Sequence, residues 1–230
     1  MCSHKYESNE TFSQIFEIID NKINDIVKEM DYKDNFKELT KMYFDWLNFW
    51  RKKAGTSQGF TGLSEYIVLK AISLFLEQKQ GIEFELKPKM GEKEYTTYFF
   101  ISKDKRVIIT HAISIDENMK STVSNEKGKE IEFDWVEEKL RPDIVIFKED
   151  NGCYRPEAVI EIKIYKVSPN AIRDEVEKFE KTSSEIKSKP LRCIIFFTKQ
   201  SDENKQGIDY FITPENQKFR EMLQNICARI

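Results

Sequence analysis

Three charged residues occur where the sequence otherwise resembles apolar β-strand. Asp143 follows Pro142 at the start of one short apolar run, and Glu161 and Lys163 lie within the next. Side chains alternate between the two faces of a strand, so Glu161 and Lys163 point to the same face. Charges inside a sheet are costly unless they bind one another or a metal ion. If the two strands pair, we expect the two carboxylates and the ammonium to meet in one patch.

This group of side chains has the chemistry for metal-dependent hydrolysis. Two carboxylates supply the hard oxygen ligands that suit Mg²⁺, which proteins usually hold with one or two carboxylates, water and substrate phosphate. A lysine beside the ion can orient or deprotonate a metal-activated water. The alternative interpretation is an internal salt bridge, or a strand edge that faces solvent, without a catalytic role.

The sequence Pro142-Asp143, followed by Glu161-Ile162-Lys163, resembles the PD-(D/E)XK nuclease superfamily. This resemblance implies an α/β fold of the α+β type, namely a restriction-endonuclease-like core with a mixed central sheet flanked by helices. It also implies a nuclease whose Mg²⁺, or Mn²⁺ in its place, is bound by Asp143, Glu161 and the Ile162 carbonyl. Lys163 would position the attacking water or steady the scissile phosphate. The implied substrate is nucleic acid, with DNA favoured over RNA, and the implied products carry a 5′-phosphate and a 3′-hydroxyl.

The bare pattern of an acid, any residue and a lysine is common in a chain that is 33% charged. It also occurs at Asp31-Lys33, Glu85-Lys87, Glu137-Lys139 and Glu185-Lys187. The strongest competitor begins at Glu85, because its neighbours also alternate as in a strand. However, no Pro-Asp strand precedes Glu85, and it comes before the strands that would build the site. Only Glu161 lies in a continuous apolar strand that follows a Pro-Asp strand and precedes a helix.

Glu65 is a further candidate for the metal site. It lies near the start of an apolar helix predicted over 62–79, on the same stripe as Val68 and Ile72. A carboxylate on a buried stripe needs a reason, and nucleases of the superfamily often carry a glutamate on the first core helix that faces the metal. By this resemblance Glu65 would bind the ion through water or complete a second site. The alternative is that Glu65 stays hydrated in the first helical turn, where the helix dipole favours an acid.

Hydrophobic periodicity divides the chain into an N-terminal helical extension, 1–60, and a nuclease-like core with a C-terminal helix, 61–230. The extension is expected to be a lid, an arm or a dimerisation element, so a homodimer is one expected assembly. Trp46 and Trp50 could stack on bases, but their helical spacing favours burial against the sheet. The resemblance to the nucleases covers 61–200. The two helices predicted in the extension span 8–30 and 35–53.

The core is predicted to hold antiparallel strands before the Pro-Asp strand and a helix after Lys163. Ser168 can cap this helix and Pro169 can open it. Residues 191–198 are continuously apolar, as in a strand buried on both faces, and a last helix is predicted over 214–228. The strand-like runs before the Pro-Asp strand are 82–86, 94–102, 106–115 and 130–136.

Three polar residues near these elements are secondary candidates. Tyr165 and Lys166 lie at the end of the strand that holds Lys163, where a substrate phosphate would sit, and we assign them to nucleic-acid binding. His111 falls in a predicted strand and is a candidate for a base or for a group behind the metal ligands. A lone histidine in a strand is more often structural.

Composition limits the classes of protein that fit. The 230 residues suit one large domain, with or without an extension. The net charge of −3 is unlike that of many proteins that bind along DNA, although basic residues cluster locally. The four cysteines have neither zinc-like nor paired spacing, and no apolar run is long enough to cross a bilayer. We therefore expect a soluble, reduced, cytoplasmic protein with no membrane partner.

Two other classes of protein remain open at this point. One is a nuclease-like fold that has lost catalysis and serves as a nucleic-acid-binding or assembly module. The intact Asp-Glu-Lys set disfavours it, because an abandoned site has no need to keep three costly groups. The other is an unrelated α/β protein in which the charges form a structural ion pair.

Overall fold

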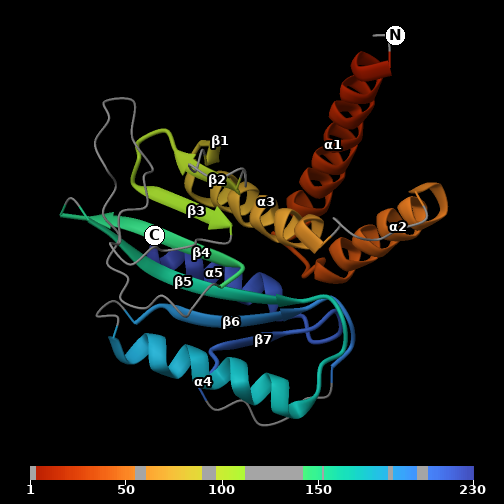
Figure 1. Cartoon of the computed structure of the whole chain (residues 1–230). Coiled ribbons are helices and arrows are strands. Elements are labelled where there is room, and N and C mark those ends of the chain that lie inside the picture. The colour runs from red at the N-terminus through yellow and green to blue at the C-terminus, as the bar shows by residue number, and fades with distance from the viewer. Residues whose placement is uncertain are drawn as a thin grey trace.

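The computed structural model describes residues 4–54, 61–89, 97–111, 142–151, 153–185, 189–200 and 207–230. These ranges contain five helices and one seven-stranded sheet (Figure 1). In chain order the elements are α1 His4–Glu29, α2 Phe36–Ala54, α3 Thr61–Gln80, β1 Phe84–Lys89, β2 Thr97–Ser102, β3 Val107–His111, β4 Ile144–Asp150, β5 Cys153–Lys163, α4 Pro169–Glu185, β6 Leu191–Phe196, β7 Tyr210–Ile212 and α5 Phe219–Arg229.

The strands follow one another across the sheet in their order along the chain, from β1 to β7. β1 to β5 are antiparallel neighbours, whereas β5, β6 and β7 run parallel. Antiparallel strands can be joined by tight turns, but a parallel pair needs a crossover, which α4 supplies between β5 and β6. The predicted α/β class with a mixed central sheet is therefore confirmed. The antiparallel arrangement that leads into the strand after Asp143 is confirmed as well.

Two hydrophobic layers lie on the two faces of the sheet. On one face, Ile144 and Ile160 pack in a cluster with side chains of α1, α2, α3 and α5. On the other face, Val145 and Val159 pack with side chains of α4, which covers that side of the sheet in Figure 1. β6 contributes side chains to both layers, so its prediction as a strand buried on both faces is confirmed.

The two N-terminal helices belong to the same hydrophobic layer as α3. Ile23 of α1 and Tyr43 of α2 are buried in it, and the Tyr43 ring meets Phe197 edge to face with centroids 5.1 Å apart. Trp46 is partly buried and packs against this layer, in line with its structural interpretation. The division into an extension and a nuclease-like core stays a prediction.

The ends of α3 and α4 follow local signals in the sequence. Gly81 has a positive φ of 66°, and its N–H donates to the Glu77 carbonyl at 2.9 Å, which ends α3 just before it. At the start of α4, the Ser168 hydroxyl accepts a hydrogen bond from the Ala171 N–H at 3.3 Å, as predicted for a cap.

The C-terminal segment differs from its prediction. The last helix, α5, begins at Phe219 rather than at 214, because the preceding residues form a turn in which the Asn216 side chain accepts a hydrogen bond from the Thr213 N–H at 3.1 Å. The short strand β7 was not predicted, because three residues are too few to show an alternating pattern.

Some predictions fall on parts of the chain that the structure does not describe. The strand predicted over 130–136 lies outside the described residues. His111 ends β3, but its side chain is outside them too. None of the described helices has the length and apolar character needed to cross a membrane.

Candidate functional site

A bulge in β5 brings the two predicted carboxylates into register. Next to the turn that joins β4 and β5, Asp150 pairs with Cys153. If this register continued along both strands, Asp143 would lie opposite Ile160. At the bulge the register shifts by one residue, so that Ile144 pairs with Ile160. Continued by one residue past this last pair, the shifted register sets Asp143 opposite Glu161. Opposite residues of antiparallel strands share a face, and a one-residue shift exchanges the faces. The bulge therefore places Asp143 on the face of Glu161.

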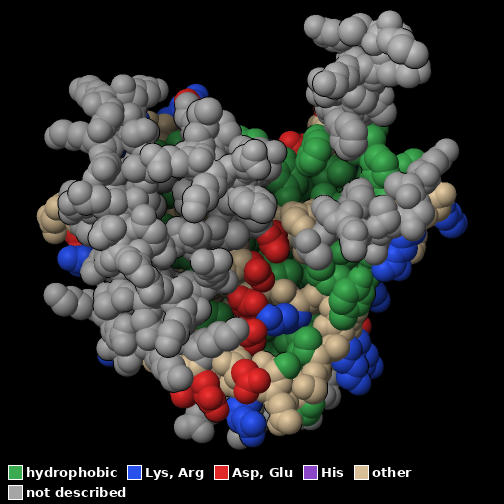
Figure 2. All heavy atoms as spheres, in the orientation of Figure 1, with side chains coloured by type: hydrophobic (Ala, Val, Ile, Leu, Met, Phe, Trp, Pro, Cys, Tyr) green, Lys and Arg blue, Asp and Glu red, His purple; other side chains and the backbone are tan. Residues whose placement is uncertain are grey.

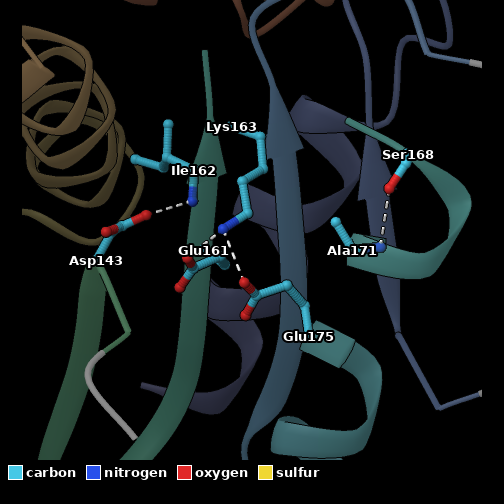
Figure 3. A network of polar contacts seen from close by, with 7 residues as sticks. All are labelled: Asp143, Glu161, Ile162, Lys163, Ser168, Ala171 and Glu175. Atoms are coloured by element: carbon cyan, nitrogen blue, oxygen red, sulfur yellow. Dashed lines mark hydrogen bonds and ion pairs between the residues drawn. The ribbon is translucent and has the colours of Figure 1, made fainter. Parts of the chain in front are cut away.

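Asp143 is tied to the backbone of β5. Its Oδ2 accepts a hydrogen bond from the Ile162 N–H at 2.6 Å (Figure 3). The Ile162 side chain is buried in the layer on the opposite face, which fixes the peptide that Asp143 contacts. The predicted approach of Asp143 to the Glu161-Ile162-Lys163 segment is therefore present in the structure.

Lys163 lies on the same face as Glu161, as the alternation of strand side chains predicts. Its Nζ is 2.6 Å from the Glu161 Oε1 and 2.9 Å from the Oε1 of Glu175, a residue of α4. Figure 3 shows the ammonium between the two carboxylates. The side chains of Lys163, Glu161 and Glu175 are only 21%, 15% and 13% exposed, so water competes weakly for these contacts.

Glu175 was not predicted as a site residue. The signal that identifies it is spacing, since Glu175 lies three residues after Ile172 and four before Phe179, both of which are buried. It therefore shares the apolar stripe of α4 that packs on the sheet, where a carboxylate needs a partner.

Glu65 of α3 lies close enough to Asp143 and Glu161 for their negative charges to affect its pKa. Burial, together with the negative charges of Asp143 and Glu161, raises the pKa of Glu65 to about 8. The site face of the molecule shows acidic side chains gathered around a basic one (Figure 2). The placement of Glu65 on the first core helix agrees with its prediction, and its role in metal binding stays a prediction.

Burial and mutual repulsion also act on Glu161. Burial and the nearby charge of Asp143 together raise its pKa to about 7, although the contact with Lys163 opposes the rise. Burial alone would lower the pKa of Lys163, but the carboxylates of Glu161 and Glu175 outweigh that effect and raise it. Lys163 is therefore an ammonium at neutral pH, suited to holding a water or a phosphate rather than to accepting a proton.

The carboxylates fit a sparse divalent site. Among the described residues, no three His, Cys, Asp or Glu side chains are grouped closely enough to hold a metal ion by themselves. Mg²⁺ does not require such a group, because it usually keeps several waters and takes one or two carboxylates plus substrate phosphate. Asp143, Glu161 and the Ile162 carbonyl form a set of that kind. A bound cation would also relieve the repulsion that the raised pKa of Glu161 reports.

The exit of β5 carries the two predicted phosphate contacts. Tyr165 is 56% exposed and Lys166 is exposed, just beyond the last residue of β5. Arg51, near the C-terminal end of α2, donates a hydrogen bond through its Nη2 to the Tyr165 hydroxyl at 3.4 Å. Gln200 fixes the same loop, since its Nε2 donates to the Val167 carbonyl at 3.0 Å. In the sequence Arg51 belongs to a basic cluster with Lys52 and Lys53, and no local pattern marks Gln200.

No protein-family model matches the chain, and no curated protein sequence is significantly similar to it.

Proposed function

We propose that the protein is a Mg²⁺-dependent nuclease of the restriction-endonuclease-like fold, which hydrolyses phosphodiester bonds in DNA. The observation that carries this proposal is the group of charges at the end of β5, where the mostly buried Lys163 and Glu161 form an ion pair and Asp143 accepts a hydrogen bond from the Ile162 N–H between them. Two carboxylates and an ammonium at this depth are costly for a merely structural purpose. They are suited to a site that binds a cation and a phosphate.

The order of elements also supports the proposal. The helix α3 is followed by the antiparallel strands β1 to β5, then by α4 and by the doubly buried strand β6. This is the order that the resemblance to the nuclease superfamily implies. The Pro-Asp and Glu-x-Lys segments fall on neighbouring strands within it, so the motif and the order of elements agree.

In the proposed mechanism, Asp143, Glu161 and the Ile162 carbonyl would hold Mg²⁺, and Glu65 would contribute to the site through water. Bound there, the ion supplies a water of lowered pKa and neutralises charge that builds on the phosphate. The Ile162 N–H fixes the orientation of the Asp143 carboxylate. The Lys163 ammonium orients the attacking water or the scissile phosphate, and Tyr165 and Lys166 contact the neighbouring phosphates.

A cleavage assay on plasmid, linear duplex, single-stranded DNA and RNA tests the proposal, with Mg²⁺, Mn²⁺ or EDTA. We expect metal-dependent cutting by the wild type and a loss of about 10²-fold or more in Glu161→Ala and in Lys163→Ala. A preference for RNA would correct the substrate while keeping the chemistry. If the folded wild type cuts none of these substrates, the nuclease proposal fails, and a nucleic-acid-binding or assembly module becomes the better account.

A further inference from the structure

Lys163 has two carboxylate partners that come from different elements. Glu161 lies two residues away on β5, whereas Glu175 belongs to α4, which packs on the sheet through Ile172 and Phe179. If Glu161 binds a divalent cation, as the proposed function requires, its oxygens and its charge are shared with that cation. The cation also repels the ammonium, so the contact between Glu161 and Lys163 weakens at the moment when Lys163 has to be in place.

We infer that Glu175 is the positioning residue of this site: it keeps the Lys163 ammonium beside the reacting phosphate when a metal occupies Asp143 and Glu161. This inference rests on the proposed function. Glu175 itself touches neither metal nor substrate and acts through Lys163.

The geometry suits this role. Glu175 Oε1 lies 2.9 Å from the Lys163 Nζ, and the Glu175 side chain is 13% exposed. A lysine side chain on its own samples many rotamers, and holding it in one of them has an entropic cost. A mostly buried carboxylate on a packed helix provides that restraint, and it leaves Asp143 and Glu161 available to bind the metal.

The test compares Glu175→Ala and Glu175→Gln with Glu177→Ala. Glu177 lies on the same helix with its side chain 59% exposed, and its Oε1 is 3.9 Å from the Arg173 Nε. This exposed, loosely paired glutamate is a matched control. Single-turnover cleavage is measured together with the KM for substrate and the Mg²⁺ concentration that gives half of the rate. The Lys163 ammonium is followed by ¹H–¹⁵N NMR with and without Mg²⁺, with its signal assigned from Lys163→Arg.

We expect Glu175→Ala to lower the single-turnover rate about 10²-fold, the loss expected when a reacting group is misplaced by about 1 Å. The KM and the Mg²⁺ midpoint should stay near the wild-type values. Glu175→Gln keeps an oxygen acceptor at the same place and should recover much of the rate, and Glu177→Ala should behave as the wild type. The ammonium signal should persist with Mg²⁺ in the wild type and disappear in Glu175→Ala.

The inference is overturned if Glu175→Ala keeps the wild-type rate, or if its ammonium signal with Mg²⁺ matches that of the wild type. It is also overturned if Glu175→Ala and Glu175→Gln lose rate and melting temperature together, since that would indicate a structural role. Should the wild type cut nothing, the proposed function fails, and the NMR signal with Mg²⁺ still decides whether Glu175 holds Lys163.

Discussion

The acid-x-lysine pattern occurs on two strands of this sheet, and the two strands place it in opposite surroundings. β1 lies at the edge of the sheet, with Glu85 exposed and Leu86 46% exposed. β5 lies between β4 and β6, and there Ile162 is 8% exposed while the Glu161 side chain is 15% exposed. The acidic residue of the same pattern is therefore exposed to water on β1 and mostly buried on β5.

What separates the two strands is the set of neighbours that the fold supplies. Glu161 lies near Asp143, which directly precedes β4, and Lys163 reaches Glu175 of α4. Near β1, the Lys103 ammonium contacts Glu83 while both side chains remain mostly exposed, and ion pairs of that kind contribute little. Burial and like-charged neighbours, rather than the pattern itself, raise the pKa of Glu161.

The largest expected difference between the strands is in catalysis. Lys163→Ala should reduce metal-dependent cleavage about 10²–10³-fold, because it removes the charged donor that positions water or phosphate. Lys87→Ala, at the same place in the β1 pattern, should leave cleavage unchanged. Single-turnover rates measure both variants, with melting temperatures to exclude unfolding. Equal losses in the two variants would contradict the difference proposed between the strands.

The next difference concerns stability without metal. Asp143→Asn should raise the melting temperature in EDTA by about 2–4 °C, which corresponds to about 1 kcal/mol in a chain of this size. The substitution removes a charge directly opposite Glu161 but keeps an oxygen that can accept the Ile162 N–H. The increase in melting temperature on adding Mg²⁺ should disappear. Glu85→Gln on β1 should change neither value. If Asp143→Asn retains the full Mg²⁺ effect, Asp143 is not a ligand.

The raised carboxyl pKa values also predict how stability without metal depends on pH. Unfolded glutamates ionise near pH 4.5, whereas in the native protein Glu161 and Glu65 stay protonated up to about 7 and about 8. Between these limits the native state holds protons that the unfolded chain has lost, so the free energy of unfolding should fall as pH rises from 4.5 to 8. Urea titrations in EDTA measure this fall. Glu65→Gln should flatten it, and a flat profile in the wild type would contradict the burial of these groups.

The smallest expected effect is at the exit of β5. Arg51→Ala should weaken nucleic-acid binding moderately and lower the slope of log affinity against log salt by about 1, as for the loss of one phosphate contact. Lys41→Ala serves as the control, because Lys41 is an exposed base of the same helix that pairs with Asp45 at 2.8 Å. Fluorescence anisotropy with Ca²⁺ in place of Mg²⁺ measures both variants. If the slope of log affinity against log salt is unchanged in Arg51→Ala, Arg51 does not contact the nucleic acid.

The sequence was sufficient to predict the centre of this site, because strand alternation is a local property. Glu161 and Lys163 had to share a face, and the helix cap at Ser168 and the helix end at Gly81 are equally local. The mixed sheet, by contrast, was implied by the resemblance to the nuclease superfamily.

The rest depends on contacts that no local pattern specifies. A one-residue bulge in β5 decides whether Asp143 faces Glu161 or Ile160, and the sequence alone does not reveal it. Glu175 reaches Lys163 only because α4 packs across the second face of the sheet. The hydrogen bond from Arg51 to Tyr165 joins residues that are far apart in the chain.

The most direct test of the account is a Mn²⁺ titration followed by electron paramagnetic resonance on the wild type, Glu161→Gln and Glu85→Gln. We predict one class of bound Mn²⁺ in the wild type and in Glu85→Gln, with an affinity at least about tenfold lower in Glu161→Gln, or about 1.4 kcal/mol of binding free energy. If Glu161→Gln binds Mn²⁺ as the wild type does, the pattern on β5 is not a metal site, and the central claim is wrong.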